Sequence, residues 1–270
     1  MEIIYNMPSL SFIGNATSYL RIPNTPDFNF GAGDFTIEWY QYQTDSNQFP
    51  RIFQIGSYDT GTSIGVSIEG GSFIFWSNNS ANFAISLDSS VYKNQWVHFA
   101  ISRASGATRV FMNGTSIFNM VDTNEYSSAN DLVIGNESVP SDTAAFGGYL
   151  SYFSWVKGVA LYTSNFTVPT DFPIVTSDYQ LLLTESSFDG TLGNTALNNN
   201  VSNTTNVPPG FPGSPPPPPP PPPPIPPFTP PTNMKKSLFA NNAMIFYTRG
   251  SLAPGGVGGV GNASIKARKT

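Results

Sequence analysis

A run of ten consecutive prolines, residues 215–224, divides this chain of 270 residues into parts that must fold differently. Each proline fixes its φ angle near −65° and lacks an N–H group, so the run can join neither a helix nor a sheet. We expect an extended polyproline II helix, which at about 3.1 Å per residue would span roughly 50 Å over residues 215–231. Ten identical residues without flanking specificity determinants, placed between a domain and a basic tail, favour a stiff spacer over a peptide ligand for aromatic grooves.

The first 196 residues show the pattern of an all-β domain. The chain contains 14% aromatic and only 11% charged residues, whereas charged residues make up roughly 25% of an average protein. Aromatic and β-branched residues suit a pleated, half-buried surface, and the residues that fill exposed helix faces are scarce. A helical bundle is therefore excluded. Short apolar runs between clusters of Gly, Asn, Asp and Ser predict one antiparallel two-sheet sandwich over residues 1–196.

Individual strands can be located by their alternation and turns. Residues 34–42 alternate an apolar set that includes Trp39 with a set that includes Glu38. Asn113 and Gly114 supply the two positive φ angles of a type I′ turn, which predicts a hairpin between strands at 109–112 and 115–118. Further strands are predicted at 51–56, 63–68, 72–76, 95–103, 131–135, 147–156 and 179–184.

The charges are distributed unequally along the chain. All 17 acidic residues lie at or before Asp189, and residues 232–270 contain six basic residues and no acidic one. Glycine supplies five of the seven residues 255–261, so this segment cannot offset its ordering entropy by itself. We predict that residues 197–231 form a polar, then proline-rich linker, and that residues 232–270 form a tail that docks on a partner. The predicted anchoring residues are Lys235, Lys236, Arg249, Lys266, Arg268 and Lys269.

Several classes of function are disfavoured by composition. The six tail charges are too dispersed to form a compact basic patch, so nucleic acid is not the predicted partner. The chain has no cysteine, which excludes disulfides, thiolate zinc sites and thiol nucleophiles. The N-terminal residues lack the basic and apolar regions of a signal peptide, and no apolar stretch is long enough to cross a membrane. We expect neither export by that route nor a membrane span.

Five segments in order resemble the concanavalin A-like lectin/glucanase superfamily, in particular its laminin-G-like jelly-roll branch. One of them, residues 94–115, contains a Trp-x-His-x-Ala strand followed by a hairpin that ends in Asn-Gly, and the segments are specific for the fold as an ordered set. The resemblance implies two antiparallel sheets packed face to face, with recognition at the rim loops and the concave face. The other matching segments are 10–40, 132–138, 146–170 and 179–191.

Some members of this superfamily are glycoside hydrolases, which need two carboxylates beside the scissile bond. No strand here carries alternating acids, and Glu38 and Glu69 each stand alone. His98, the only histidine, falls where the family carries a structural histidine, and no Gly-x-Ser-x-Gly motif accompanies it. We therefore predict no catalytic residues and no enzymatic activity.

Bound calcium is a further possibility that the resemblance raises, since related domains hold the ion with loop carboxylates. Acidic residues do fall in predicted loops, but they form no 12-residue calcium loop, and solvated turns explain them equally well. We predict no cofactor and assign no metal ligands, while calcium stays open as an alternative. The loop acids are Asp122, Asp131, Glu137 and Asp142.

Exposed aromatic rings could stack on sugars, although most aromatic residues of a sandwich belong to its core. The candidates near predicted loops are Tyr58, Trp76, Tyr92 and Tyr126.

The segment 249–270 also resembles C-terminal tails of structural proteins in large DNA viruses. We predict a non-enzymatic virion protein, a minor capsid or fibre component assembled in the host cytoplasm. Its head would recognise glycans or neighbouring coat proteins in host attachment, and its tail would dock into the capsid. Two alternatives stay open: an architectural cement protein that binds no glycan, and a cell-surface carbohydrate-binding lectin module.

Overall fold

The alternating pattern at residues 34–42 folds as the central strand β3 (Phe35–Gln43). In this computed structural model the described residues are 9–44, 47–56, 64–77, 80–171, 173–183, 194–209 and 211, with only the backbone described at 77 and 80–82. Trp39 points into the core, and Glu38 lies on the opposite face. Both faces of β3 are buried, because the segment 159–169 covers the outer one: the Tyr162 hydroxyl donates to Glu38 and the Tyr40 hydroxyl to the Pro169 carbonyl.

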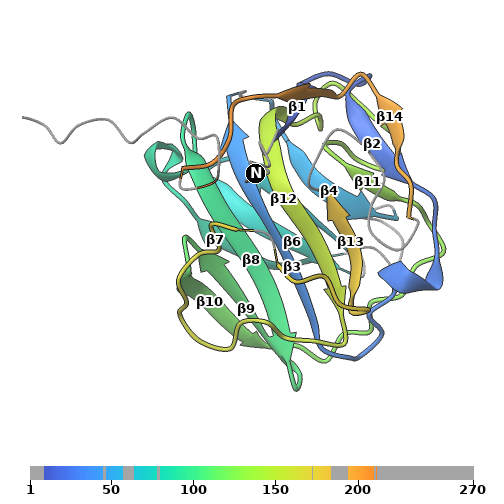
Figure 1. The fold of residues 1–270 in the computed structure, drawn as a ribbon, viewed down its shortest axis with the longest axis vertical. Helices are drawn as coiled ribbons and strands as arrows, with labels where there is room; N and C mark the ends of the chain where they lie inside the picture. Colours follow the sequence, from blue (N-terminus) through green and yellow to red (C-terminus); the bar gives the residue numbers. More distant parts are fainter. Residues whose placement is uncertain are drawn as a thin grey trace, which may run out of the picture. The chain divides into compact units, whose positions relative to one another are not determined.

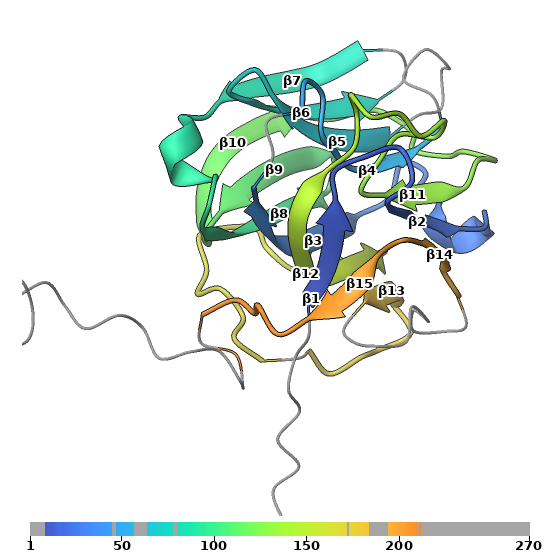
Figure 2. The ribbon, with the colours of Figure 1, turned by 90° about the horizontal axis from the view of Figure 1, so that it is seen from above.

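The fold is an all-β jelly-roll sandwich of two antiparallel sheets, as predicted (Figures 1 and 2). The first sheet has eight strands in the order β10-β9-β8-β3-β12-β1-β15, and β13 pairs with β12 beside β1. Besides β3, its strands are β1 (Ser9–Ile13), β8 (Trp96–Ala104), β9 (Ala107–Met112), β10 (Thr115–Val121), β12 (Gly147–Lys157), β13 (Tyr179–Leu183) and β15 (Ser202–Thr204).

The second sheet has seven strands in the order β14-β2-β11-β4-β5-β6-β7. In the described part of the chain the helical segments are two three-residue 3-10 turns, Pro26–Phe28 and Ser89–Val91, neither of which could cross a membrane. The strands of this sheet are β2 (Tyr19–Ile22), β4 (Arg51–Ile55), β5 (Ile64–Glu69), β6 (Ser72–Ser77), β7 (Ser80–Ser86), β11 (Leu132–Ile134) and β14 (Leu197–Asn199).

The predicted hairpin is confirmed as β9 and β10, joined at Asn113 and Gly114 with φ angles of 48° and 75°. Glycine is required at the second position for two reasons. The positive φ disfavours a side chain, and a Cβ atom there would lie 2.1 Å from the carbonyl oxygen of Phe166. The turn thereby lets the segment that covers β3 approach the backbone closely.

Aromatic residues fill the space between the sheets. Trp39 lies at the centre of this cluster, with the ring centroids of Phe99 and Phe53 at 5.8 and 5.9 Å and those of Phe73 and Phe153 slightly farther away. Such pairs add about 0.5–1.5 kcal/mol each beyond the burial of apolar area. The high aromatic content of the sequence is thus explained by the core.

One end of the core contains a fully buried arginine, Arg103 of β8. Its guanidinium group donates to the carbonyl oxygens of Gly33 and Asn124 at 2.8 and 2.7 Å and also to that of Gly31. The carboxylate of Asp122 lies 3.8 Å away and accepts hydrogen bonds from the hydroxyls of Thr108 and Tyr126. Arg103 therefore ties two loops to the end of the first sheet.

The sandwich extends past residue 196, where the sequence placed the end of the domain and the start of a linker. Residues 197–211, which we call the strap, contribute β14 to the second sheet and β15 to the first (Figure 2). Val207 and Phe211 of the strap are buried against Tyr40 and Tyr152. The predicted start of the linker at residue 197 is therefore wrong. The polar composition of this segment suggested a linker because its short edge strands pair through their backbones and bury only a few apolar side chains.

The predicted stalk at 215–231 and the predicted tail at 232–270 lie outside the described residues, and so does Tyr58. Their assignments stay predictions.

Candidate functional site

The two carboxylates considered for hydrolysis lie in different parts of the molecule. Glu38 is fully buried on the outer face of the first sheet, where its Oε2 atom lies 3.2 Å from Nε2 of His98 and accepts a 2.8 Å hydrogen bond from Tyr162. His98 is also fully buried, so neither group reaches solvent. Glu69 lies on the second sheet and belongs to a pocket.

The floor of this pocket is the outer face of the second sheet. On β5, Ile64, Val66 and Ile68 point into the core, which turns Ser67 and Glu69 outward. Strand register then places Arg51 of β4 opposite Ser67. The Trp76 indole of β6 donates a 2.9 Å hydrogen bond to the Ser67 hydroxyl, so all these side chains meet on one face.

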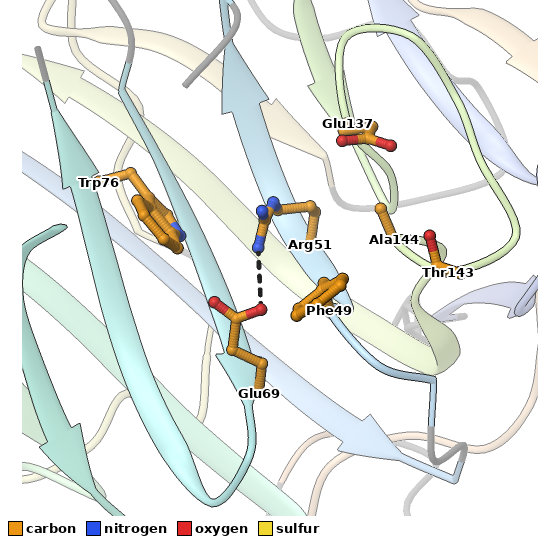
Figure 3. Close-up of a pocket in the computed structure, with 7 residues that line it drawn as sticks. All are labelled: Phe49, Arg51, Glu69, Trp76, Glu137, Thr143 and Ala144. Carbon is orange, nitrogen blue, oxygen red and sulfur yellow. Dashed lines mark hydrogen bonds and ion pairs between the residues drawn. The ribbon is translucent and has the colours of Figure 1, made fainter. Parts of the chain in front are cut away.

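Arg51 is the central charged group of the pocket (Figure 3). Its guanidinium carbon lies 5.1 Å from the ring centroid of Trp76, and its Nη1 atom lies 3.5 Å from a carboxylate oxygen of Glu69. The arginine is almost completely buried, whereas the indole is half-buried. The cation–π contact between Arg51 and Trp76 holds both side chains in place, which gives the pocket floor a defined shape.

A loop after β11 forms the opposite wall. The Ser141 hydroxyl donates to Glu137 at 2.6 Å, and the backbone N–H groups of Phe49 and Arg51 donate to the carbonyls of Thr143 and Ala144, each at 2.9 Å. The ring of Phe49 is 40% exposed at the rim. The pocket encloses about 320 Å³, and its lining residues are Phe49, Arg51, Glu69, Trp76, Glu137, Thr143 and Ala144.

This combination of groups suits a small polyhydroxylated ligand. Aromatic rings offer apolar faces for the C–H surface of a sugar, and the planar groups of Arg51 and Glu69 can hydrogen-bond to vicinal hydroxyls. The volume lies at the lower end of the range for ligand pockets. We therefore take this pocket as the candidate binding site.

The predicted aromatic residues have different environments. Trp76 lines the pocket, as just described. Tyr126 is buried, stacks edge-on against Phe35, and donates to Asp122, so its ring does not lie in an exposed loop as we expected. Burial, with the charge of Asp122, raises the pKa of its hydroxyl. Tyr92 is also buried, with 3% exposure, although it lines a second cavity.

Sequence reasoning missed the other members of the pocket as a set. Glu69 was considered as a catalytic acid and Glu137 as a loop acid, and nothing pointed to Phe49 or Arg51. The pocket joins residues that are up to 95 positions apart in the chain, from Phe49 to Ala144. No local spacing could have signalled that arrangement.

The four loop acids do not come together. Asp131 pairs with Arg21 at 3.3 Å, Asp142 accepts from the backbone N–H of Ala16 at 2.7 Å, and Asp122 is buried beside Arg103. Among the described residues, no group of three or more His, Cys, Asp or Glu side chains is arranged to hold a metal ion.

A family model described as the concanavalin A-like lectin/glucanases superfamily, of the laminin-G type, matches residues 14–161, more than half of the chain. The chain belongs to the concanavalin A-like lectin/glucanase superfamily. No curated protein sequence matches it.

Solved structures agree on this superfamily fold. A candidate carbohydrate-binding protein from Bacteroides ovatus superposes with a TM-score of 0.56 at 13% identity over 73% of this chain, which spans 59% of that protein. The heptameric SAP-like pentraxin of Limulus polyphemus gives a TM-score of 0.53, also at 13% identity, over 73% of this chain and 94% of the pentraxin. At these identities the likeness establishes the fold.

Proposed function

We propose that this protein is a non-enzymatic recognition protein whose lectin-like head binds glycans at the Trp76 pocket. The observation that carries the proposal is the meeting of an indole, a rim phenylalanine and an Arg51–Glu69 ion pair on the outer face of the second sheet. The carbohydrate-binding description of the Bacteroides ovatus structure is consistent with this role.

We expect Trp76→Ala to lower glycan affinity at least tenfold, because the mutation removes the largest apolar surface of the pocket and the ring that holds Arg51. The measurement is a glycan array with the full chain, followed by titration calorimetry on the strongest ligand. Ile174→Ala is the matched control, since Ile174 is 90% exposed and does not line the pocket.

Thermal unfolding of both variants separates lost binding from lost folding. A folded Trp76→Ala variant with unchanged affinity would contradict the site. If the wild-type head binds no glycan on the array, the architectural cement role is favoured instead.

We further propose that the head belongs to a virion protein, a minor capsid or fibre component, with residues 215–231 as its stalk and the basic tail docked into the capsid. The supports are the separation of acidic head and basic tail, the absence of cysteine, and the resemblance of segment 249–270 to viral tails. Many displayed copies would increase avidity for a glycan surface.

Deleting residues 232–270 should reduce incorporation into purified particles to background while glycan binding by the head is retained. The physical reason is that the tail carries all six basic residues that could pair with acidic capsid grooves. Immunoblots of purified particles measure incorporation. A full-length variant with these six residues changed to glutamine tests whether the tail's positive charge is needed, at constant chain length. Normal incorporation of the deletion variant would refute the proposal that the tail anchors the protein in the capsid.

A further inference from the structure

The carboxyl group of Glu137 is held in a defined position by the loop after β11. The fully buried side chain of Asn136 accepts hydrogen bonds at its Oδ1 atom from the backbone N–H groups of Glu137 and Ser141, at 2.9 and 3.1 Å. The Ser141 hydroxyl in turn donates to one carboxylate oxygen of Glu137 at 2.6 Å. The loop thus fixes an acidic group in the wall of the Trp76 pocket, and in Figure 3 this group lies on the opposite side of Arg51 from Trp76.

The charges that line this pocket do not cancel. Arg51 is paired with Glu69 at 3.5 Å, and the other carboxylate oxygen of Glu69 accepts from the Ser67 hydroxyl at 3.1 Å. Glu137, in contrast, forms no ion pair with any of the described residues. The Arg51–Glu69 pair is neutral as a unit, so the pocket keeps the negative charge of Glu137.

The surroundings of the pocket do not compensate this charge. Arg21 donates to the carbonyl of Ser138 at 2.9 Å, next to Glu137, but it is already paired with Asp131 at 3.3 Å. Over the whole of residues 1–231 the chain contains 17 acidic but only six basic residues. The field of the head therefore adds to the attraction of the pocket for a cation.

A carboxylate beside aromatic rings suits an ammonium group that is carried on an apolar surface. Glu137 can accept a charge-assisted hydrogen bond from such a group, and a half-buried carboxylate gains most from a ligand that brings the opposite charge. The rings of Trp76 and Phe49 offer π faces both to a cation and to C–H groups.

We infer that the glycan bound at the Trp76 pocket contains an amino sugar with a free ammonium group, of the glucosamine type, and that Glu137 recognises this group. The inference rests on the proposed glycan-binding function. It names the chemical class of the ligand: a cationic sugar, selected against sugars of the same shape that carry a hydroxyl in its place.

The test compares two ligands that differ only in this group. The β-1,4-linked trimers of glucose and of glucosamine carry a hydroxyl or an amine at C2 of each unit, and both are titrated against the full-length protein by calorimetry. At about pH 6, where the sugar amine is protonated, the wild-type protein should bind the glucosamine trimer at least tenfold more tightly.

Glu137→Gln keeps the shape of the side chain and removes its charge, so it should reduce this preference to about threefold or less. Glu125→Gln is the matched control, because Glu125 is exposed and does not line the pocket. This control should keep the wild-type preference. Thermal unfolding of both variants shows whether each is folded, and a ratio of two affinities measured on one folded variant does not depend on its stability.

Different results overturn the inference and the proposed function. Equal binding of the two trimers, or an undiminished preference in folded Glu137→Gln, would contradict the amino sugar and leave glycan binding intact. Binding of Nα-acetyl-lysine amide as tightly as the glucosamine trimer would also contradict it, since the amine would then be recognised without the sugar. Failure of both trimers, with binding of neutral or acidic glycans on the array, would exclude the cationic class alone. Absence of all glycan binding would overturn the proposed function.

Discussion

Replacing Arg103 by methionine will lower the free energy of unfolding by about 3–5 kcal/mol, a large part of the 5–15 kcal/mol that stabilises an ordinary domain. The side chain is fully buried, and methionine fills much of its volume without its charge. The carbonyl oxygens of Gly33 and Asn124 would lose the arginine as donor, and the buried Asp122 would lose the cation at 3.8 Å. The carbonyl oxygen of Gly31 would keep only the backbone N–H of Tyr126 as donor. Urea unfolding followed by tryptophan fluorescence measures the change.

Arg109→Met is the matched control for that measurement. Arg109 lies on the adjacent strand β9 opposite Ser102 and is half-buried, so its replacement should change stability by about 0.5 kcal/mol or less. Adding Asp122→Asn to Arg103→Met should recover part of the loss, because the uncompensated buried charge is then removed. Equal effects of Arg103→Met and Arg109→Met would show that the buried arginine contributes nothing specific.

Local chemistry accounts for the parts of the fold that the sequence predicted correctly. The β9–β10 hairpin follows from two residues that tolerate positive φ, and β3 follows from alternation around Trp39. These signals act over a few residues and depend little on what packs against them. The sequence did not predict one aspect of β3: its outer face, which includes Glu38, is covered by the segment 159–169.

The pocket could not be predicted in the same way. Trp76 was predicted as a glycan-binding residue because it is aromatic and lies near a predicted loop. Its contact with Arg51, in contrast, depends on the pairing of β4, β5 and β6 in one register. Register is set by packing between distant segments, and a shift of one residue would turn Ser67 and Glu69 into the core. The same reason explains why Tyr92 and Tyr126, both near predicted loops, are buried.

The strap, like the pocket, depends on packing between distant segments that the composition did not reveal. Removing the strap should destabilise the fold more than replacing Arg103 does. A chain ending at residue 196 should lose cooperative unfolding at 25 °C, whereas a chain ending at residue 213 should unfold as the full-length protein does. The shorter chain lacks β14 and β15, which pair with β2 and β1. It also lacks Val201, Val207 and Phe211, whose burial contributes about 1.5–3 kcal/mol each.

Thermal unfolding followed by circular dichroism compares the two truncated chains. Phe211→Ala in the full-length chain serves as the point-mutation counterpart, because this ring packs edge-on against Tyr40 with centroids 5.3 Å apart, and its removal should cost about 3–5 kcal/mol. If the chain ending at residue 196 unfolds at the same temperature as the longer one, the strap does not contribute to the stability of the sandwich. If it does not, the residues leading to the proline run are anchored in both sheets, and any head prepared for glycan binding must retain residues 197–211.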